Sequence, residues 1–444
     1  MSFTTKRSKL TEPDAPDFIS ALPNEVLSSI LSLVPVKDAA RTSVLSSRWR
    51  HLWKEAPLRL DDASIEPDEL TLVFNKLEWS RKAVSKIILG SHGPIESLRL
   101  SRFTKPKLFP EMDRILESAT QKGLRKLTLL ANFDYKNHYV LPRSLLCCNS
   151  LHQLSLGGCE FPEELSLPVS IFPNLKELRL AKVSLSNDSL QMLLSGCRSL
   201  ETLHFISFGG LCITISSPSL RNLVWDSSVV VQELIIKDVP NLESLMFSEH
   251  TTALCKVKVL NAPKLQLLGP LRMDFRALQL GSTFFDRQAE RYRWPIGQSC
   301  VKVKASPCQM KRLSSVKTLA IKMEPSLNRR VPDILRCFPC LENLYIRKGE
   351  GSLSGNRNYS DLGTWDEQGS LSFLDHLKTV TVKGFYDDRS DVELVRYLVF
   401  HGNKLRKITL LCSKQTFSNT TGMEQDFLIA GTGADGDAAA EHED

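Results

Sequence analysis

The hydrophobic residues between positions 18 and 53 recur at helical spacing and predict three short helices. In the first run they lie three and four residues apart and occupy more than one side of the helix: Val26, Leu27, Ile30, Leu31, Leu33 and Val34. Pro23 suits the first helical position, because its missing N–H would be unpaired there, and Pro35 ends the helix. A second helix is predicted to begin near Asp38, and a third follows a cap at Ser46 or Ser47.

These helices carry more apolar surface than about forty residues can bury by themselves. Each large apolar side chain left in water forgoes roughly 1.5–3 kcal/mol. Either the rest of the chain or another protein must therefore cover this surface. The pattern alone leaves two alternatives open, a helical cap on a larger core and a module that docks on a partner.

Beyond residue 90 the phrase L-x-x-L-x-L recurs along the chain. Copies begin at Ile95, Leu124, Leu151, Leu175, Leu200, Leu220, Leu242 and Leu265, and further copies at Val316, Leu341, Leu377 and Leu405. The intervals from Ile95 to Leu265 are 29, 27, 24, 25, 20, 22 and 23 residues, which is the period of a leucine-rich repeat. Units this small cannot bury their own apolar side. They are therefore predicted to stack into an α/β solenoid of irregular repeats, with parallel strands on the concave face.

The period of two within each strand predicts which side chains face outwards. The leucines point into the core, and the third and fifth residues of each phrase point to the concave surface. This outward row is mostly polar and mixed in charge: Lys126, Thr128, Gln153, Ser155, Glu177, Arg179, Thr202, His204, Asn222, Val224, Ser244 and Met246. Our candidate substrate-binding residues are Gln153, Ser155, Glu177, Arg179, Thr202, His204 and Asn222. The alternative is a solvated face with no partner.

The repeat rhythm fails between residues 281 and 315 and returns afterwards. The interruption is predicted to be an inserted loop or a short helix, and the sequence assigns it no role. Residues 377–382 and 405–411 then predict two strands around a helix that a Ser390-x-x-Glu393 capping box opens. The predicted buried side of that helix consists of Leu394, Val395, Leu398 and Val399. Such a unit is one more solenoid turn and is expected to cap the repeat stack.

Composition and cysteine usage indicate an ordinary intracellular chain. Of 444 residues, 42% are hydrophobic and 24% are charged, which is typical of a globular protein. The sequence has no signal-peptide pattern and no apolar run near the roughly 20 residues that span a bilayer, so we expect the cytoplasm or nucleus and no membrane. The 11 cysteines are scattered and should be free thiols. Cys337 and Cys340 have the spacing of half a zinc site but no matching second pair, so no metal is expected.

The net charge of +7 is unevenly distributed. Residues 415–444 contain seven acids and no Lys or Arg, so residues 1–414 carry +14. The basic residues are dispersed and have few aromatic neighbours, so we do not expect nucleic acid as the partner. No metalloprotease, hydrolase, phosphate-loop or dinucleotide motif is present, which argues against an enzyme and predicts no cofactor.

The N-terminal helices resemble an F-box. The motif's positions are filled in order by Leu22-Pro23, Glu25, Ile30-Leu31, Leu33, Pro35-Val36-Lys37-Asp38, Arg41, Ser43-Val44, Ser46, Arg48-Trp49 and Leu52-Trp53. The resemblance implies docking on a Skp-like adaptor of a cullin-RING (SCF) ubiquitin ligase. The residues expected to contact that adaptor are Leu22, Pro23, Ile30, Leu31, Val36, Val44, Leu45, Trp49 and Trp53. The repeats are similar to the degenerate leucine-rich repeats of plant F-box proteins, and residues 371–412 are similar to their FBD domain.

The expected organisation follows from these resemblances and from the patterns. In order it is a disordered segment (1–16), the F-box (17–58), a helical linker (59–90), the repeat solenoid (91–336), an FBD-like cap (337–412) and a disordered acidic tail (413–444). The expected function is that of a non-catalytic subunit that recognises an unknown target protein for ubiquitination. The alternative is a scaffold in which the three helices dock on their own solenoid and no ubiquitin chemistry is involved.

Overall fold

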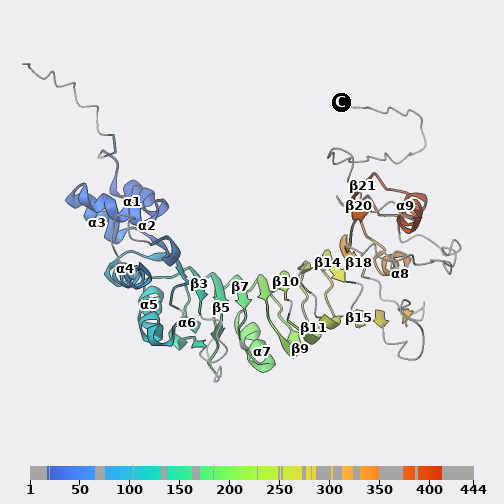
Figure 1. The fold of residues 1–444 in the computed structure, drawn as a ribbon, viewed down its shortest axis with the longest axis horizontal. Helices are drawn as coiled ribbons and strands as arrows, with labels where there is room; N and C mark the ends of the chain where they lie inside the picture. The colour runs from blue at the N-terminus through green and yellow to red at the C-terminus, as the bar shows by residue number, and fades with distance from the viewer. Residues whose placement is uncertain are drawn as a thin grey trace, which may run out of the picture. The chain divides into compact units, whose positions relative to one another are not determined.

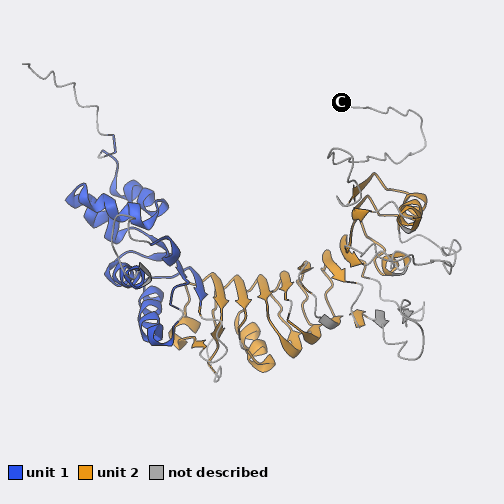
Figure 2. Ribbon diagram, in the orientation of Figure 1, with its two compact units in different colours: residues 1–130 blue, residues 131–444 orange. Residues whose placement is uncertain are grey.

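Figure 1 shows a computed structural model of the 444-residue chain. The structure describes residues 18–19, 21–65, 76–103, 105–131, 138–162, 171–183, 185–227, 229–248, 251, 254–272, 277–281, 283–286, 302–303, 313–323, 331–349, 374–385 and 389–412. The chain divides into two compact units, residues 1–130 and residues 131–444 (Figure 2). The predicted disordered segments 1–16 and 413–444 lie outside the described residues.

Unit 1 begins with the predicted three helices. They are α1 (Asn24–Leu33), α2 (Val36–Arg41) and α3 (Ser47–Glu55), with a 3-10 turn η1 (Thr42–Val44) before α3. The predicted cap of the third helix is confirmed, because the Ser46 side chain accepts a hydrogen bond from the Trp49 amide at 3.3 Å. The predicted start near Asp38 was wrong. Pro35 directly precedes α2, and Asp38 lies in the first turn, where the helix dipole favours negative charge.

The remainder of unit 1 contains three parallel strands with helices between them. The elements are β1 (Leu58–Asp61), η2 (Asp62–Ser64), α4 (Lys76–Gly90), β2 (Ile95–Leu100), η3 (Pro106–Leu108), α5 (Phe109–Gln121) and β3 (Lys126–Leu130), and the strands pair in the order β1, β2, β3. The prediction of a helical linker over residues 59–90 did not include the strand β1 at its start. Leu58 and Leu60 are buried on either side of exposed Arg59, which is the period of a strand.

Unit 2 is built on a long parallel sheet. Its strands, in spatial order, are β5 (Gln153–Gly157), β7 (Glu177–Ala181), β8 (Thr202–Ile206), β10 (Asn222–Asp226), β12 (Ser244–Phe247), β14 (Leu267–Arg272), β18 (Thr318–Met323), β19 (Asn343–Lys348), β20 (Thr379–Phe385) and β21 (Lys407–Cys412). In most of these strands the alternate apolar residues that end the repeat phrase are buried, as are Leu154 and Leu156 of β5 and Val380 and Val382 of β20. The predicted parallel solenoid is confirmed.

The other side of unit 2 holds the segments that connect these strands (Figure 1). They form α6 (Arg143–Leu146), α7 (Asn187–Gly196), the small strands β4 (Tyr139–Val140) and β6 (Cys159–Glu160), and a second sheet of β9 (Gly210–Ile215), β11 (Val231–Ile236), β13 (Leu254–Val259), β15 (Ala277–Leu280), β16 (Thr283–Asp286) and β17 (Lys302–Val303). The prediction of a loop or short helix over 281–315 was wrong for its described part. There β16 pairs antiparallel with both β15 and β17.

The C-terminal repeats contain α8 (Val331–Leu335) and α9 (Arg389–His401), with α9 between β20 and β21 as predicted. Two details of α9 were predicted wrongly. The helix begins at Arg389, so Ser390 lies inside it and is not its cap. Its buried stripe is Asp391, Leu394, Tyr397 and Leu398, whereas Val395 is half-buried and Val399 is 43% exposed. The buried side of the helix is therefore turned towards Asp391 and Tyr397 and away from Val395 and Val399.

No helix in the described part of the chain has the length and apolar character that a membrane span requires.

Candidate functional site

The three-helix module of unit 1 (residues 22–56) has a small core of its own. Leu27, Leu31, Ala39, Leu52 and Ala56 are buried together, and Leu22, Val34, Trp49 and Trp53 pack against them. The two tryptophans are therefore partly covered by their own chain and keep part of their surface accessible. The core is complete without a partner, so what the module leaves exposed is a separate surface.

That surface is strongly apolar. Val44 and Leu45, in and directly after η1, are 80% and 68% exposed. The large apolar side chains left exposed on or just before the module are Phe18, Ile19, Val26, Ile30, Leu33, Val44 and Leu45, which we call the apolar face. Large apolar side chains left exposed in such number on one small module commonly mark a binding site. The arrangement can hold a protein partner by burial of these side chains.

The predicted adaptor contacts fall into three groups. Pro23, Ile30, Val44 and Leu45 are exposed, and Leu22, Trp49 and Trp53 are half-buried. Leu31 and Val36 are 3% and 5% exposed, so their assignment as contacts has to be corrected. Both side chains are buried within unit 1.

The prediction missed four members of the apolar face, Phe18, Ile19, Val26 and Leu33. The sequence contained a signal for two of them, Val26 and Leu33, which lie in α1. Val26, Ile30 and Leu33 follow a second apolar stripe along α1, beside the buried stripe of Leu27 and Leu31.

The module is fixed firmly to the first strands of unit 1. The Arg48 side chain donates to the Asn24 side chain at 2.9 Å and to the Leu22 carbonyl, which joins α3 to the start of α1. At the other end of α3, the amides of His92 and Gly93 donate to the Lys54 carbonyl at 2.8 and 3.0 Å. A Cβ built on Gly93 would lie 2.3 Å from the Glu55 carbonyl oxygen. Only a glycine allows the chain before β2 to approach α3 this closely.

The long sheet of unit 2 presents a second surface, the open face, which carries the third, fifth and seventh residue of each repeat phrase. The structure brings the predicted target-binding residues together in two neighbouring rows. Gln153, Glu177, Thr202 and Asn222 lie side by side in one row, and Ser155, Arg179 and His204 lie in the next.

Hydrogen bonds link the members of these rows. Glu177 accepts from the Gln153 side chain at 3.1 Å and from the Arg179 side chain at 2.7 Å. Asn222 donates to the Thr202 hydroxyl at 3.3 Å. These residues therefore form one polar cluster across β5, β7, β8 and β10.

His204 has a distinct environment within this cluster. Its Nε2 atom is buried and has no hydrogen-bond partner among the described residues. Burial lowers the pKa of His204, and the Arg179 guanidinium lowers it further, against the opposing effect of Asp226 and Glu177. The ring is therefore held in its neutral form more strongly than a histidine in water.

A basic row at the ends of the later strands was missed in the sequence. Arg272, Lys322, Arg347 and Lys383 are successive partners in register on β14, β18, β19 and β20. At the strand starts, by contrast, charges alternate in sign. Lys176 pairs with Glu201, Arg221 with Glu243, and Lys378 with Glu342.

The signal for the basic row was the seventh residue of each phrase, as in VKTLAIK, LENLYIR and LKTVTVK. The row places four positively charged side chains at neighbouring register positions on these strands. Tyr345, 47% exposed on β19, adds an aromatic side chain beside it.

The buried cysteines fit a structural role. Cys159 is fully buried, its thiol donates to the Gly157 carbonyl at 3.5 Å, and burial raises its pKa to about 12. Cys337 is buried and Cys340 is half-buried. In the described ranges no group of three or more His, Cys, Asp or Glu side chains is arranged to hold a metal ion.

Comparison with known protein families decides the assignment of the repeats. Residues 112–346, more than half of the chain, match the family described as "FBD-associated F-box protein At5g56370, LRR repeats". The chain belongs to this family of F-box proteins. Residues 19–61 match the F-box domain and residues 371–410 match the FBD. The F-box match contains the whole three-helix module, and the FBD match contains β20, α9 and most of β21.

Three relatives of this F-box protein come from Arabidopsis thaliana. The chain is 30% identical to the "F-box/FBD/LRR-repeat protein At1g13570" over 53% of its own length and 55% of that protein. It is 38% identical to the "Putative FBD-associated F-box protein At5g56690" over 42% of its length and 46% of that protein. It is 30% identical to the "F-box/LRR-repeat protein At3g26922" over 59% of its length and 77% of that protein. The chain thus spans about half the length of the first two of these relatives.

Proposed function

We propose that this F-box protein is the substrate-recognition subunit of an SCF-type ubiquitin ligase. In this assignment the apolar face binds a Skp-like adaptor, and the adaptor links the chain to a cullin-RING ligase. The open face and the FBD bind a target protein. The chain itself makes no covalent bond.

The observation that carries the proposal is the apolar face. The F-box core is already closed by Leu27, Leu31, Ala39, Leu52 and Ala56, yet Val44, Leu45 and Leu33 are each more than two-thirds exposed. Burying each of them fully would contribute roughly 1.5–3 kcal/mol. An adaptor that covers the face supplies that stabilisation, which the described part of the chain does not.

The second part of the proposal concerns positioning. Hydrogen bonds to Lys54 and the close approach at Gly93 hold α3 against β2 within unit 1. Because the F-box is held in this way, a bound adaptor would have a fixed orientation relative to the first strands of unit 1. Orientation and proximity of a bound target can supply a large part of a rate enhancement without any catalytic group in this chain. We therefore propose a non-catalytic role, exercised in the cytoplasm or nucleus.

Adaptor binding is tested with the pair Val44→Asp and Leu45→Asp, introduced together. Both side chains are mostly exposed, so the substitutions should not unfold the chain. Two buried charges in the interface should weaken binding to a purified Skp-type adaptor at least ten-fold in a calorimetric titration. The matched control is Leu211→Asp with Val230→Asp, which are 73% and 62% exposed outside the F-box.

The control variant should bind the adaptor like the unmodified chain. Undiminished binding by the Val44→Asp, Leu45→Asp variant would refute the assignment of the face. If the unmodified chain itself shows no affinity for any Skp-type adaptor, the chain is instead a scaffold unconnected with ubiquitination.

A further inference from the structure

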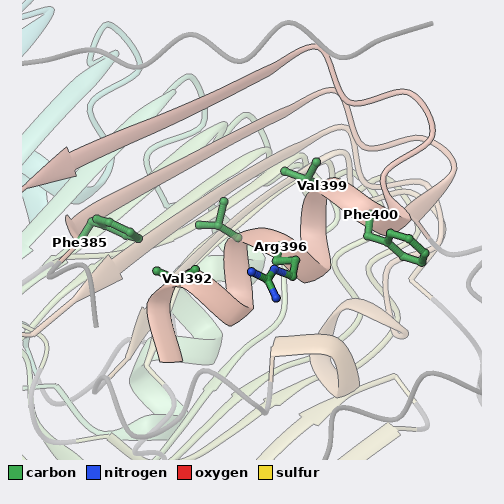
Figure 3. Close-up of a pocket in the computed structure, with 6 residues that line it drawn as sticks. Phe385, Val392, Arg396, Val399 and Phe400 are labelled. Atoms are coloured by element: carbon green, nitrogen blue, oxygen red, sulfur yellow. The ribbon is translucent and has the colours of Figure 1, made fainter. Parts of the chain in front are cut away.

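Helix α9 of the FBD has an apolar outer side in addition to its buried stripe. A pocket on this side is lined by Phe385, Val392, Val395, Arg396, Val399 and Phe400 (Figure 3). Phe400 is 79% exposed, and Val392 and Val399 are 38% and 43% exposed. Among the described residues that line it, Arg396 alone is charged. The pocket therefore suits an apolar peptide that also carries negative charge.

The last strand, β21, ends beside a residue that lines this pocket. Phe385, at the end of β20, pairs in register with Cys412, the last residue of β21. Adjacent strands lie roughly 4.8 Å apart, so the segment after Cys412 starts within one strand spacing of a pocket residue. The outer stripe of α9 from Val392 to Phe400 extends only about 12 Å at 1.5 Å per residue. A short stretch of chain is enough to reach all of it.

The sequence after Cys412 contains one segment with the required chemistry. Residues 413–444 are mostly small or polar, and four of their five large apolar side chains fall in Met423–Ile429, as Met423, Phe427, Leu428 and Ile429. Glu424 and Asp426 lie between them. Met423 is eleven positions beyond Cys412, and a span of that length reaches up to roughly 36–40 Å when extended.

We propose that the outer side of α9 is the binding site of the segment Met423–Ile429 of the same chain. The apolar side chains of the segment cover Val392, Val399 and Phe400. The carboxylates of Glu424 and Asp426 lie near Arg396. This internal contact shields the exposed apolar side of the FBD. The proposal does not depend on adaptor binding.

Photo-crosslinking of the full chain tests the contact directly. Phe400→p-benzoylphenylalanine places a photoreactive group at an aromatic position of the pocket that is 79% exposed. Irradiation of an equal mixture of light and heavy isotope-labelled protein should give crosslinks to residues 423–429 within one copy. Crosslinks between light and heavy copies would show self-association and overturn the proposal, and so would crosslinks to other parts of the chain.

A binding titration provides an independent test. The probe is a fluorescent peptide of residues 421–431, and the protein is the full chain with Phe427→Asp and Leu428→Asp, which frees the pocket. A tethered segment acts at an effective concentration of about 1 mM, so the intact chain should bind the probe at least ten-fold more weakly whenever the peptide's own Kd is below about 0.1 mM. Ala438→Asp with Ala439→Asp is the control that adds the same charges elsewhere in the tail.

The control chain should bind the probe as weakly as the intact chain. Adding Val399→Asp and Arg396→Glu to the freed chain should abolish binding. Equal affinity of the probe for the freed and the intact chain would overturn the proposal, as would binding that survives the changes at Val399 and Arg396.

Discussion

Lys348 and Asp391 form an ion pair in which both side chains are fully buried. Lys348 is the last residue of β19, and Asp391 lies in the first turn of α9, so the pair joins the sheet to the helix of the FBD. A buried ion pair costs much desolvation, and its attraction roughly offsets that cost. The pair therefore specifies where α9 docks on the sheet more than it stabilises the fold.

Removing one member of this pair should be far more harmful than removing both. Lys348→Met or Asp391→Leu alone leaves an uncompensated buried charge and should lower the free energy of unfolding by about 3–5 kcal/mol. The double variant should recover most of that loss in urea unfolding. Arg389→Ala is the control. It breaks the exposed Arg389–Glu393 pair and should cost less than about 1 kcal/mol. A double variant as unstable as the single ones would contradict this account.

Gly93 should be essential for the link between the F-box and the first repeat. A Cβ at this position meets the backbone oxygens of Glu55 and Ala56 at 2.3 and 2.6 Å, and backbone cannot move aside as a flexible side chain can. Gly93→Ala should destabilise unit 1 by about 1–3 kcal/mol. Gly90→Ala, with nothing within 4 Å of the new Cβ, should leave the unfolding midpoint unchanged or slightly raised. Equal midpoints for the two variants would disprove the packing argument.

His204 should titrate below its ordinary pKa of 6.5, as measured by NMR on the imidazole ring. Arg179→Gln should raise this pKa, because it removes a nearby positive charge, and Glu177→Gln should lower it, because it removes a negative one. Shifts in the same direction for both variants would contradict the arrangement of the polar cluster.

The same residue makes stability depend on pH. The unfolded chain binds the proton of His204 more readily than the folded chain, so stability rises with pH through this group. Its contribution is complete above about pH 6.5 and is lost as the pH falls below that value towards the lower folded pKa. His204→Gln should flatten the dependence of the unfolding free energy on pH in that window.

The sequence was sufficient for the repeats but not for the segments between them. The phrase L-x-x-L-x-L predicts its strand locally, since alternate leucines bury on one side. The strands β9, β11, β13 and β15 pair in that order within the second sheet, with partners about 20 residues apart, and their stretches carry no shared phrase. Strands so far apart in the sequence pair only when the repeats are stacked, so no local sequence pattern predicts their pairing.

The sequence predicted which residues of the F-box are apolar, but not which of them are exposed. Helical spacing identified the apolar residues of the F-box, but it did not separate Leu31, which is buried, from Leu33, which is 73% exposed. Which stripe of α1 faces the core is fixed by where α3 packs. In α9, likewise, helical spacing did not separate Leu398, which is buried, from Val399, which lines the pocket.

Thiol reactivity should follow burial along the chain. Burial raises the pKa of Cys159 and Cys197 to about 12, so only about one molecule in 10⁴ carries either thiolate at pH 8. Cys147, Cys212 and Cys412 are exposed and should react in minutes with iodoacetamide. Mass-spectrometric mapping after brief treatment of the native protein should find the exposed group modified and the buried pair intact. Repeating the labelling in 6 M urea provides the control, because both groups should then react alike. Modification of Cys159 in the native protein at the rate of Cys412 would contradict its position in the core of the repeat stack.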